Sequence, residues 1–146
     1  MMKPMNLTTY RAGLLQARAY RRLKAFMTEQ LESYNVTMMQ WTLLGHIHDY
    51  SQQEGIRTST LAGIFDVQTS LMTNMVNDLQ KQKLVYRSID PDDSRARRIR
   101  LTDEGIEFVD EVEQKIRAAM KEWLGDINRK HLQHYLYVTR VLAEEK

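Results

Sequence analysis

The fold is decided by residues 84–105, whose sequence is LVYRSIDPDDSRARRIRLTDEG. Leu84–Ile89 is apolar and β-branched enough to form one strand, and Arg98–Leu101 alternates basic and apolar side chains as a second strand does. Between them, residues 90–94 (DPDDS) are of types that favour turns. The stretch therefore predicts a β-hairpin with a polar, basic tip.

Two short helices are predicted directly before the hairpin. The first begins at Thr58, which we expect to cap it, and ends near Asp66; the second runs from about Gln68 to Lys81. Their apolar spacing lets them cross on a shared core, which is the helix-turn-helix arrangement. The hairpin then serves as a wing, and residues 57–102 form a winged helix-turn-helix lobe. The side chains expected in the core of the two helices are Leu61, Ala62, Ile64, Leu71, Met72, Met75, Val76 and Leu79.

Longer helices are predicted on both sides of this lobe. Residues 8–33 have helical apolar spacing, and Thr37 with Gln40 has the spacing of a capping box that starts the next helix. After the hairpin, Thr102 is expected to cap a helix that ends near Gly125, and a last helix follows over about 128–144. The predicted order is α-α-α-α-β-β-α-α, a single mainly α-helical domain over residues 1–146 with a small β-hairpin.

Composition narrows the class of protein. The chain has 146 residues, 42% of them hydrophobic, which fits one globular domain, and it has no cysteine for disulfides, zinc sites or thiol redox switches. No apolar run approaches the roughly 20 residues of a membrane-spanning helix. We therefore expect a soluble, cytoplasmic protein without membrane contact. The net charge is only +2, but residues 57–102 carry an excess of basic residues and residues 103–146 an excess of acidic ones.

The chemistry of the chain is concentrated in the second short helix and the hairpin. A helix placed after a tight turn can enter a major groove about 12 Å wide and present its first turns to base edges. The non-core positions of this helix are short hydrogen-bonding side chains, and the hairpin has four arginines between positions 95 and 100. Arginine at a hairpin tip suits the narrow, electronegative minor groove. Each feature alone is also typical of a solvated face, but their order on a winged helix favours DNA.

A second class of function stays open on these residues. A winged helix can be a protein-interaction module whose basic hairpin docks on an acidic surface, with only non-specific DNA affinity. No catalytic constellation, phosphate-cradling glycine loop or metal-ligand motif is present, so we expect neither an enzyme nor a metal site.

The motifs resemble those of one known family. Residues 90–96 (DPDDSRA) and 101–105 (LTDEG) are similar to the wing-and-helix signature of the multiple-antibiotic-resistance regulator (MarR) family. Residues 37–44 (TMMQWTLL) resemble the start of the family's second helix, and Leu61-Ala62 with residues 79–85 (LQKQKLV) matches its helix-turn-helix frame. The resemblance covers nearly the whole chain.

The resemblance implies a homodimeric winged-helix transcription factor, usually a repressor, that binds a pseudo-palindromic operator in double-stranded DNA. Residues of about 1–33 and 103–146 would form the dimerisation region. Their broad apolar stripes also favour a partner surface, although a monomer with a thick helical cap stays open. Arg95 would be the minor-groove arginine and Asp93 the carboxylate that orders the wing. The residues expected at DNA are Thr58, Gln68, Thr69, Ser70, Thr73, Asn74, Asp93, Arg95, Arg97 and Arg98.

The chain departs from the family pattern at three positions. Ser94 stands where the family commonly has a first wing arginine, and Asn74 where the recognition helix often has one. Each change removes a phosphate or base contact, for which Arg97 and Arg98 are candidate substitutes. Lys83 stands where many relatives have glycine at the helix end.

MarR-like proteins often hold a small aromatic or phenolic anion between the dimer helices and the DNA-binding lobe, and such an effector is the one small molecule that we expect here. The same residue types on helices are more typical of a core than of a ligand pocket. The candidate ligand residues are Arg18, Tyr34, Met39, Trp41 and His46.

Overall fold

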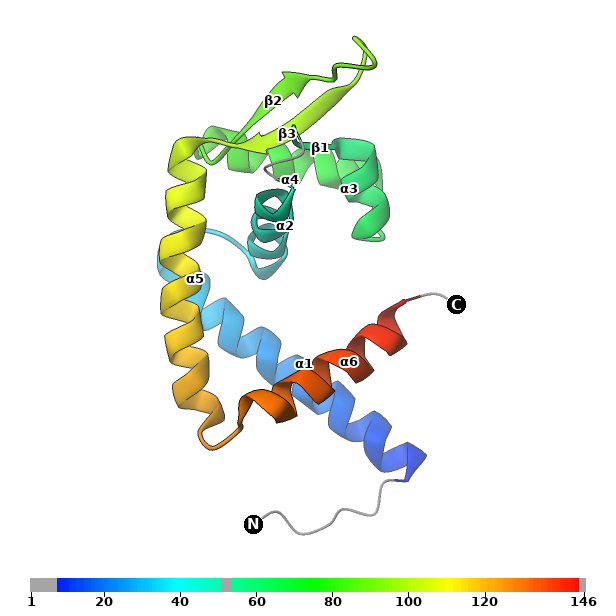
Figure 1. Cartoon of the computed structure of the whole chain (residues 1–146), viewed down its shortest axis with the longest axis vertical. Helices are drawn as coiled ribbons and strands as arrows, with labels where there is room; N and C mark the ends of the chain where they lie inside the picture. Colours follow the sequence, from blue (N-terminus) through cyan, green and yellow to red (C-terminus); the bar gives the residue numbers. More distant parts are fainter. Residues whose placement is uncertain (1–7, 51–53, 145–146) are drawn as a thin grey trace. The chain divides into compact units, whose positions relative to one another are not determined.

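The computed structural model of the chain describes residues 8–50 and 54–144 (Figure 1). By their internal contacts these residues divide into two compact units, the first ending at Val112 and the second beginning at Glu113. The first unit contains α1 (Thr9–Leu31), η1 (Glu32–Tyr34), α2 (Met38–Asp49), β1 (Ile56–Arg57), α3 (Thr58–Ile64), α4 (Thr69–Lys81), β2 (Val85–Ile89) and β3 (Arg97–Leu101). Helix α5 (Asp103–Leu124) crosses the boundary, and α6 (Arg129–Ala143) lies in the second unit. The predicted winged helix-turn-helix is confirmed.

Local hydrogen bonds set where the longer helices begin. Thr37 Oγ1 accepts the N–H of Gln40 at 3.1 Å, and Gln40 Oε1 accepts the N–H of Thr37 at 2.9 Å, so the predicted capping box is present at the start of α2. Thr102 Oγ1 accepts the N–H of Gly105 at 2.9 Å in the first turn of α5, and the Asn128 side chain caps α6. These capping hydrogen bonds could be predicted from the sequence because they join residues that are only three positions apart.

Helices α3 and α4 both end at a residue in the left-handed conformation, Asp66 with φ 51° and Lys83 with φ 62°. The N–H of Leu84 donates to the carbonyl of Leu79 at 3.1 Å, and that of Lys83 to Gln80 at 2.9 Å. This is the Schellman ending, which usually takes glycine because an L side chain is strained there. The tight exit brings β2 directly alongside α4.

The sheet has three antiparallel strands in the order β1-β3-β2. In the hairpin, Val85 pairs with Leu101 and Ile89 with Arg97, and on the other side of β3 Arg57 pairs with Arg98. The two-residue β1 was not predicted, because so short a strand has no periodicity and forms only by pairing with β3. Figure 1 shows the hairpin of β2 and β3 extending past α3 and α4 to a free tip.

The core of the first unit holds the sheet and the helix-turn-helix together. Two predicted core residues are wrong: Ile64 and Leu71 are 45% and 46% exposed. At 100° per residue, Leu71 lies about 40° outside the arc of buried α4 residues, and Ile64 is the last residue of α3. The predicted Thr58 cap is also wrong, because Arg57 occupies the N-cap position of α3. The fully buried side chains of this unit include Leu31, Leu43, Leu44, Ile47, Leu61, Met72, Val76, Leu79 and Ile99.

In the second unit, α6 has no buried residue although just over half of its side chains are apolar. Six of these lie more than two-fifths exposed: Tyr135, Leu136, Tyr137, Val138, Val141 and Leu142. The apolar face of this helix is therefore only partly covered within its own chain.

Candidate nucleic-acid interface

Helix α4 presents short polar side chains on the face opposite its core residues. Thr69, Ser70 and Asn74 are exposed, as is Gln68 at the N-cap position, and Thr73 is half-buried. Met72 and Val76 anchor the other face with no exposed surface. Ser70 and Asn74 thus lie opposite the core residues, while Gln68 and Thr69 lie at the start of the helix; all four are donors and acceptors of the kinds that contact base edges.

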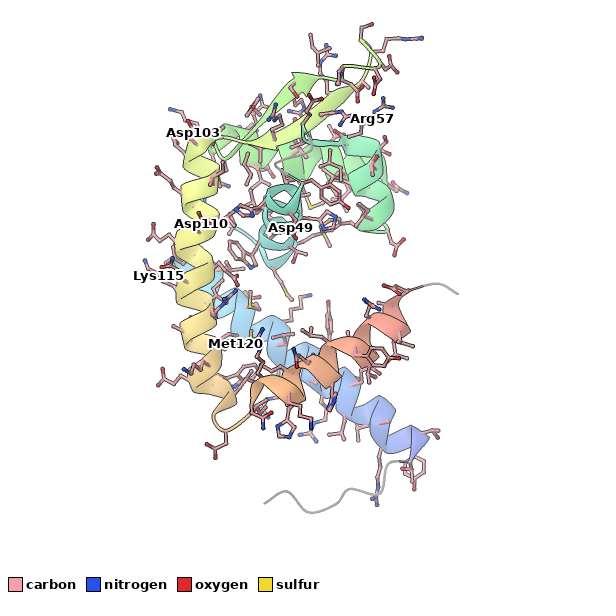
Figure 2. All side chains as sticks on the ribbon, viewed as in Figure 1. Asp49, Arg57, Asp103, Asp110, Lys115 and Met120 are labelled. Carbon is pink, nitrogen blue, oxygen red and sulfur yellow. The ribbon has the colours of Figure 1, made fainter. Side chains whose placement is uncertain are left out.

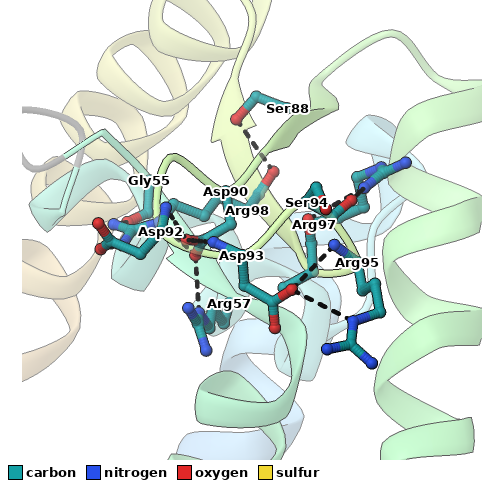
Figure 3. Close-up of polar contacts among 11 residues, drawn as sticks. Gly55, Arg57, Ser88, Asp90, Asp92, Asp93, Ser94, Arg95, Arg97 and Arg98 are labelled. Atoms are coloured by element: carbon teal, nitrogen blue, oxygen red, sulfur yellow. Dashed lines mark hydrogen bonds and ion pairs between the residues drawn. The ribbon is translucent and has the colours of Figure 1, made fainter.

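Asp90 organises the base of the wing (Figure 3). Its side chain is fully buried, and its Oδ2 accepts hydrogen bonds from Nε of Arg57 at 2.7 Å and from Nε of Arg98 at 2.8 Å. Its Oδ1 accepts the backbone N–H groups of Asp92 at 2.8 Å and Asp93 at 3.2 Å, which forms an Asx turn. One carboxylate therefore joins the turn of the hairpin to both β1 and β3.

The pairing of the strands explains why a carboxylate is needed there. Arg57 and Arg98 lie directly opposite each other on neighbouring strands, where like charges repel. Asp90 lies between their guanidinium groups and offsets that repulsion. The hydrogen bond from Arg57, helped by that from Arg98, holds the pKa of the Asp90 carboxyl well below its usual range, and the same pairing raises the pKa of Arg57. The wing is therefore held by charge-assisted bonds at its base.

The tip of the wing has its own local bonds. Asp93 Oδ1 accepts the backbone N–H of Arg95 at 3.0 Å, and Nη1 of Arg97 donates to the carbonyls of Ser94 at 3.0 Å and Ala96 at 3.1 Å. The Arg95 side chain itself is 95% exposed and lies 3.8 Å from the Asp93 carboxylate. The turn is thus fixed while one guanidinium is presented to solvent (Figure 3).

Two predicted DNA residues have different surroundings. The Arg98 side chain is only 22% exposed and forms an ion pair with Asp90, so its charge is already compensated within the wing. Thr58 is half-buried at the first position of α3. Arg57, the residue before it, is labelled in Figure 2 at the start of α3.

The sequence model of the MarR family matches residues 36–96, from the residue before the α2 capping box to the tip of the wing. Among curated proteins of Bacillus subtilis, the HTH-type transcriptional regulator YhbI is 33% identical over 91 residues, which are 62% of this chain and 57% of YhbI. The regulator YwaE is 26% identical over 112 residues, 76% of this chain and 64% of YwaE. The chain thus spans less than two thirds of the length of these two relatives. The HTH-type transcriptional repressor MdtR is 25% identical over 125 residues, 86% of this chain and 79% of MdtR.

Solved structures have the same fold. A MarR-family transcriptional regulator from Rhodococcus sp. RHA1 superposes with a TM-score of 0.82 at 18% identity, over 97% of this chain and all of that chain. MepR of S. aureus, in a complex with DNA, superposes with a TM-score of 0.73 at 23% identity, over 94% of this chain and 98% of the MepR chain. CouR from Rhodococcus jostii RHA1, bound to p-coumaroyl-CoA, superposes with a TM-score of 0.78 at 18% identity, over 90% of this chain and 91% of the CouR chain.

Residues 36–96 of the chain are a MarR-family domain.

The five expected ligand residues of this chain differ in their surroundings. Arg18 and Met39 are exposed, and Trp41 is buried in the core. The ring of Tyr34 packs edge-on against Phe108 at 5.9 Å. His46 lies between the rings of Tyr50 at 5.2 Å and Phe65 at 5.9 Å. Two shallow hollows lie on this unit, and neither is lined by any of the five candidates.

Sequence reasoning missed two residues of the wing, Asp90 and Arg57. Asp90 was included only as a turn former, and Arg57 is 33 positions away from it, so no local pattern connects the two. Within residues 8–50 and 54–144, no cluster of three metal-ligating side chains occurs, and no helix has the length and hydropathy of a membrane span.

Proposed function

We propose that the chain is a homodimeric, sequence-specific DNA-binding regulator of transcription that acts as a repressor. The observation that carries the proposal is the wing, whose base is locked by Asp90 and whose tip presents Arg95 almost fully to solvent. A guanidinium on a rigid turn loses little freedom when it enters a minor groove. The polar face of α4 on the same unit is suited to the adjoining major groove. The MepR complex with DNA supports this use of the fold.

Exposed apolar surface supports the homodimer. No side chain of α6 is buried, and α1 adds four apolar residues that are more than two-fifths exposed: Tyr10, Leu14, Leu15 and Tyr20. Large apolar side chains exposed along a helix, as on each of these two, are typical of an interaction site in a globular protein. A second copy of the chain brings the same helices and makes a self-complementary contact with two-fold symmetry, which a pseudo-palindromic operator matches.

Release of the repressor by a small aromatic or phenolic effector is the finer part of the proposal. It is supported by the neighbour CouR, whose structure holds p-coumaroyl-CoA. The relative MdtR, a transcriptional repressor, supports only the repressor role. Tyr34, Met39, Trp41, His46 and Arg18 stay as the candidate contacts. A ligand must bind the DNA-free state more tightly than the DNA-bound state to cause release.

Fluorescence anisotropy tests the proposal directly. The purified protein is titrated onto DNA from the region upstream of its own gene and onto a shuffled sequence, across a salt series. A preference of about a thousandfold, with a steep loss of affinity as salt rises, is expected of a specific regulator. Equal, weak binding to both DNAs would reject the proposal for that operator and favour the protein-interaction module, and a pull-down would follow.

Two variants assign the contacts within the interface. Arg95→Ala is expected to weaken operator binding by about tenfold to a hundredfold, because it removes the exposed wing arginine. Arg117→Ala is the matched control once sedimentation shows that it still dimerises, since it removes an exposed arginine of α5 that pairs with Glu113 at 2.9 Å. Thr73→Ala is expected to change sequence preference more than affinity for shuffled DNA. Equal effects of Arg95→Ala and Arg117→Ala would remove Arg95 from the interface.

A further inference from the structure

Arg87 reaches from the sheet onto helix α4. It is the central residue of β2, and its Nη2 donates to Asn77 Oδ1 at 2.7 Å while its Nη1 donates to Gln80 Oε1. Both amides belong to the second half of α4. The guanidinium is therefore held by two neutral oxygens, not by a carboxylate, so these contacts leave its positive charge uncompensated.

The two amides lie on the same face of α4 as the candidate base-contacting residues. At 100° per residue, positions 70, 73, 74, 77, 80 and 81 fall within a sector of about 120°. The buried residues Met72, Met75, Val76 and Leu79 fall on the opposite side. Arg87 is thus placed at the far end of the polar face, in line with Thr73.

This position supplies a charge that the helix lacks. The sequence of α4, TSLMTNMVNDLQK, has one basic residue, Lys81 in its last turn. A shallow hollow on the surface is lined by Asn77, Gln80, Lys81 and Arg87. Two cations and two amides around one hollow form an anion-binding surface at the end of the polar face.

The hydrogen-bonding capacity of Arg87 fits a phosphate. A guanidinium has five N–H donors in a planar fork, and the two amide contacts orient that plane while leaving donors for an oxyanion. The amides have side-chain N–H donors of their own. A DNA backbone phosphate beside the major groove is an anion that a helix face entering that groove meets along its length.

We propose that Arg87, oriented by Asn77 and Gln80 and assisted by Lys81, binds a backbone phosphate of DNA at the end of the α4 polar face. The inference rests on the proposed DNA binding and adds to it a contact made from the sheet instead of from the recognition helix or the wing tip. Asn77 and Gln80 are positioning residues for the guanidinium.

The test is the salt dependence of binding to operator and shuffled DNA. Each neutralised phosphate contributes about 0.9 to the slope of log affinity against log salt. Arg87→Ala is expected to lower that slope by about 0.9 and to weaken both DNAs by the same factor, about tenfold at low salt. Arg117→Ala removes an exposed arginine of α5, outside α4 and the wing, and is expected to leave the slope unchanged; because α5 lies in the expected dimerisation region, sedimentation must first show that this variant still dimerises.

Two further variants separate charge from orientation and guard against a folding defect. Arg87→Lys keeps the charge and is expected to keep the slope while losing part of the affinity, because an ammonium lacks the fork. Gln80→Ala leaves the cation in place on an exposed helix position and is expected to weaken binding by a few fold at an unchanged slope. Thermal melting of each variant shows whether it is folded.

The outcomes are distinguishable from those of the proposed function. If the wild-type protein shows no preference for the operator, specific regulation is rejected. The slope of log affinity against log salt on shuffled DNA still measures the phosphate contact in that case. An Arg87→Ala slope equal to wild type, in a folded variant, overturns the phosphate site and leaves Arg87 a bond between β2 and α4. A loss confined to operator DNA also overturns it, because that pattern indicates a base contact.

Discussion

Gly105, in the first turn of α5, is expected to be a position where even one methyl group is excluded. A Cβ added there would lie 2.0 Å from the carbonyl oxygen of Leu84 and 3.3 Å from Oγ1 of Thr102. The obstacle at 2.0 Å is backbone, which cannot rotate away as the end of a flexible side chain can. Gly105→Ala must therefore separate the start of α5 from the start of β2 by about 1 Å or more to reach an ordinary contact.

The cost can be estimated from the contacts that this movement disturbs. The Leu84 carbonyl accepts the N–H of Thr102 at 3.1 Å, and Thr102 Oγ1 donates to the carbonyl of Lys83 at 2.6 Å. Loss of two hydrogen bonds costs about 1 kcal/mol each, and overpacking adds about 1–3 kcal/mol. Alanine returns about 0.5–1 kcal/mol as a better helix former than glycine. The net expectation is a loss of about 2–4 kcal/mol in the free energy of unfolding.

Urea denaturation at one fixed protein concentration measures this effect, with Gly45→Ala as the matched control. Gly45 lies inside α2, and a Cβ added there meets no atom within 4 Å. The control is therefore expected to gain about 0.5–1 kcal/mol, while the midpoint of Gly105→Ala falls by about 1–2 M urea. Equal midpoints for the two variants would refute the close approach of α5 to Leu84.

Three other predictions follow from single features. Asp90→Asn is expected to be less stable than wild type at pH 7; because the pKa of Asp90 is lowered in the folded state, its contribution is present above about pH 4 and is lost as the pH falls. Thermal melts should thus show the difference narrowing below pH 4, and a constant difference would contradict the ion pairing. Lys83→Gly is expected to gain about 1 kcal/mol in urea unfolding, since glycine adopts the φ of 62° found there without strain; a loss would argue against the Schellman ending. Truncation before Asn128 is expected to give a folded monomer, because α6 has no buried residue, and a truncated chain that still sediments as a dimer would place the interface elsewhere.

Short-range signals made most of the secondary structure predictable. Thr37 and Gln40 are three residues apart, and both bonds of the capping box depend only on that spacing. The ends of α4 fell within a residue of prediction, because its apolar period and flanking residues are local properties. Burial was predicted less well at Leu71, since a helical period identifies an apolar arc but not its limits, which the packed neighbours set.

The residue types of the candidate interface were predictable from the sequence, but which of its arginines are exposed and which form ion pairs was not. The polar face of α4 and the exposure of Arg95 follow from helix period and turn position. Four arginines in the wing looked equivalent in sequence, yet Arg98 is held by Asp90 while Arg95 extends into solvent. That difference arises because Arg98 lies in β3 opposite Arg57, whereas Arg95 lies in the turn before β3 begins.

The sequence by itself determined the order of helices and strands, the turn at residues 90–94, and the residue types available for DNA, because periodicity, capping and turn preference act over a few positions. Only the tertiary structure decided which charges meet. It paired Arg57 with Arg98 across β1 and β3 and placed Asp90 between them, and it laid Arg87 over Asn77 and Gln80 on α4. Arg57 and Asp90, for example, are 33 positions apart in the chain. These contacts depend on chain packing that brings separate elements within hydrogen-bond distance, and no spacing in the sequence encodes that distance.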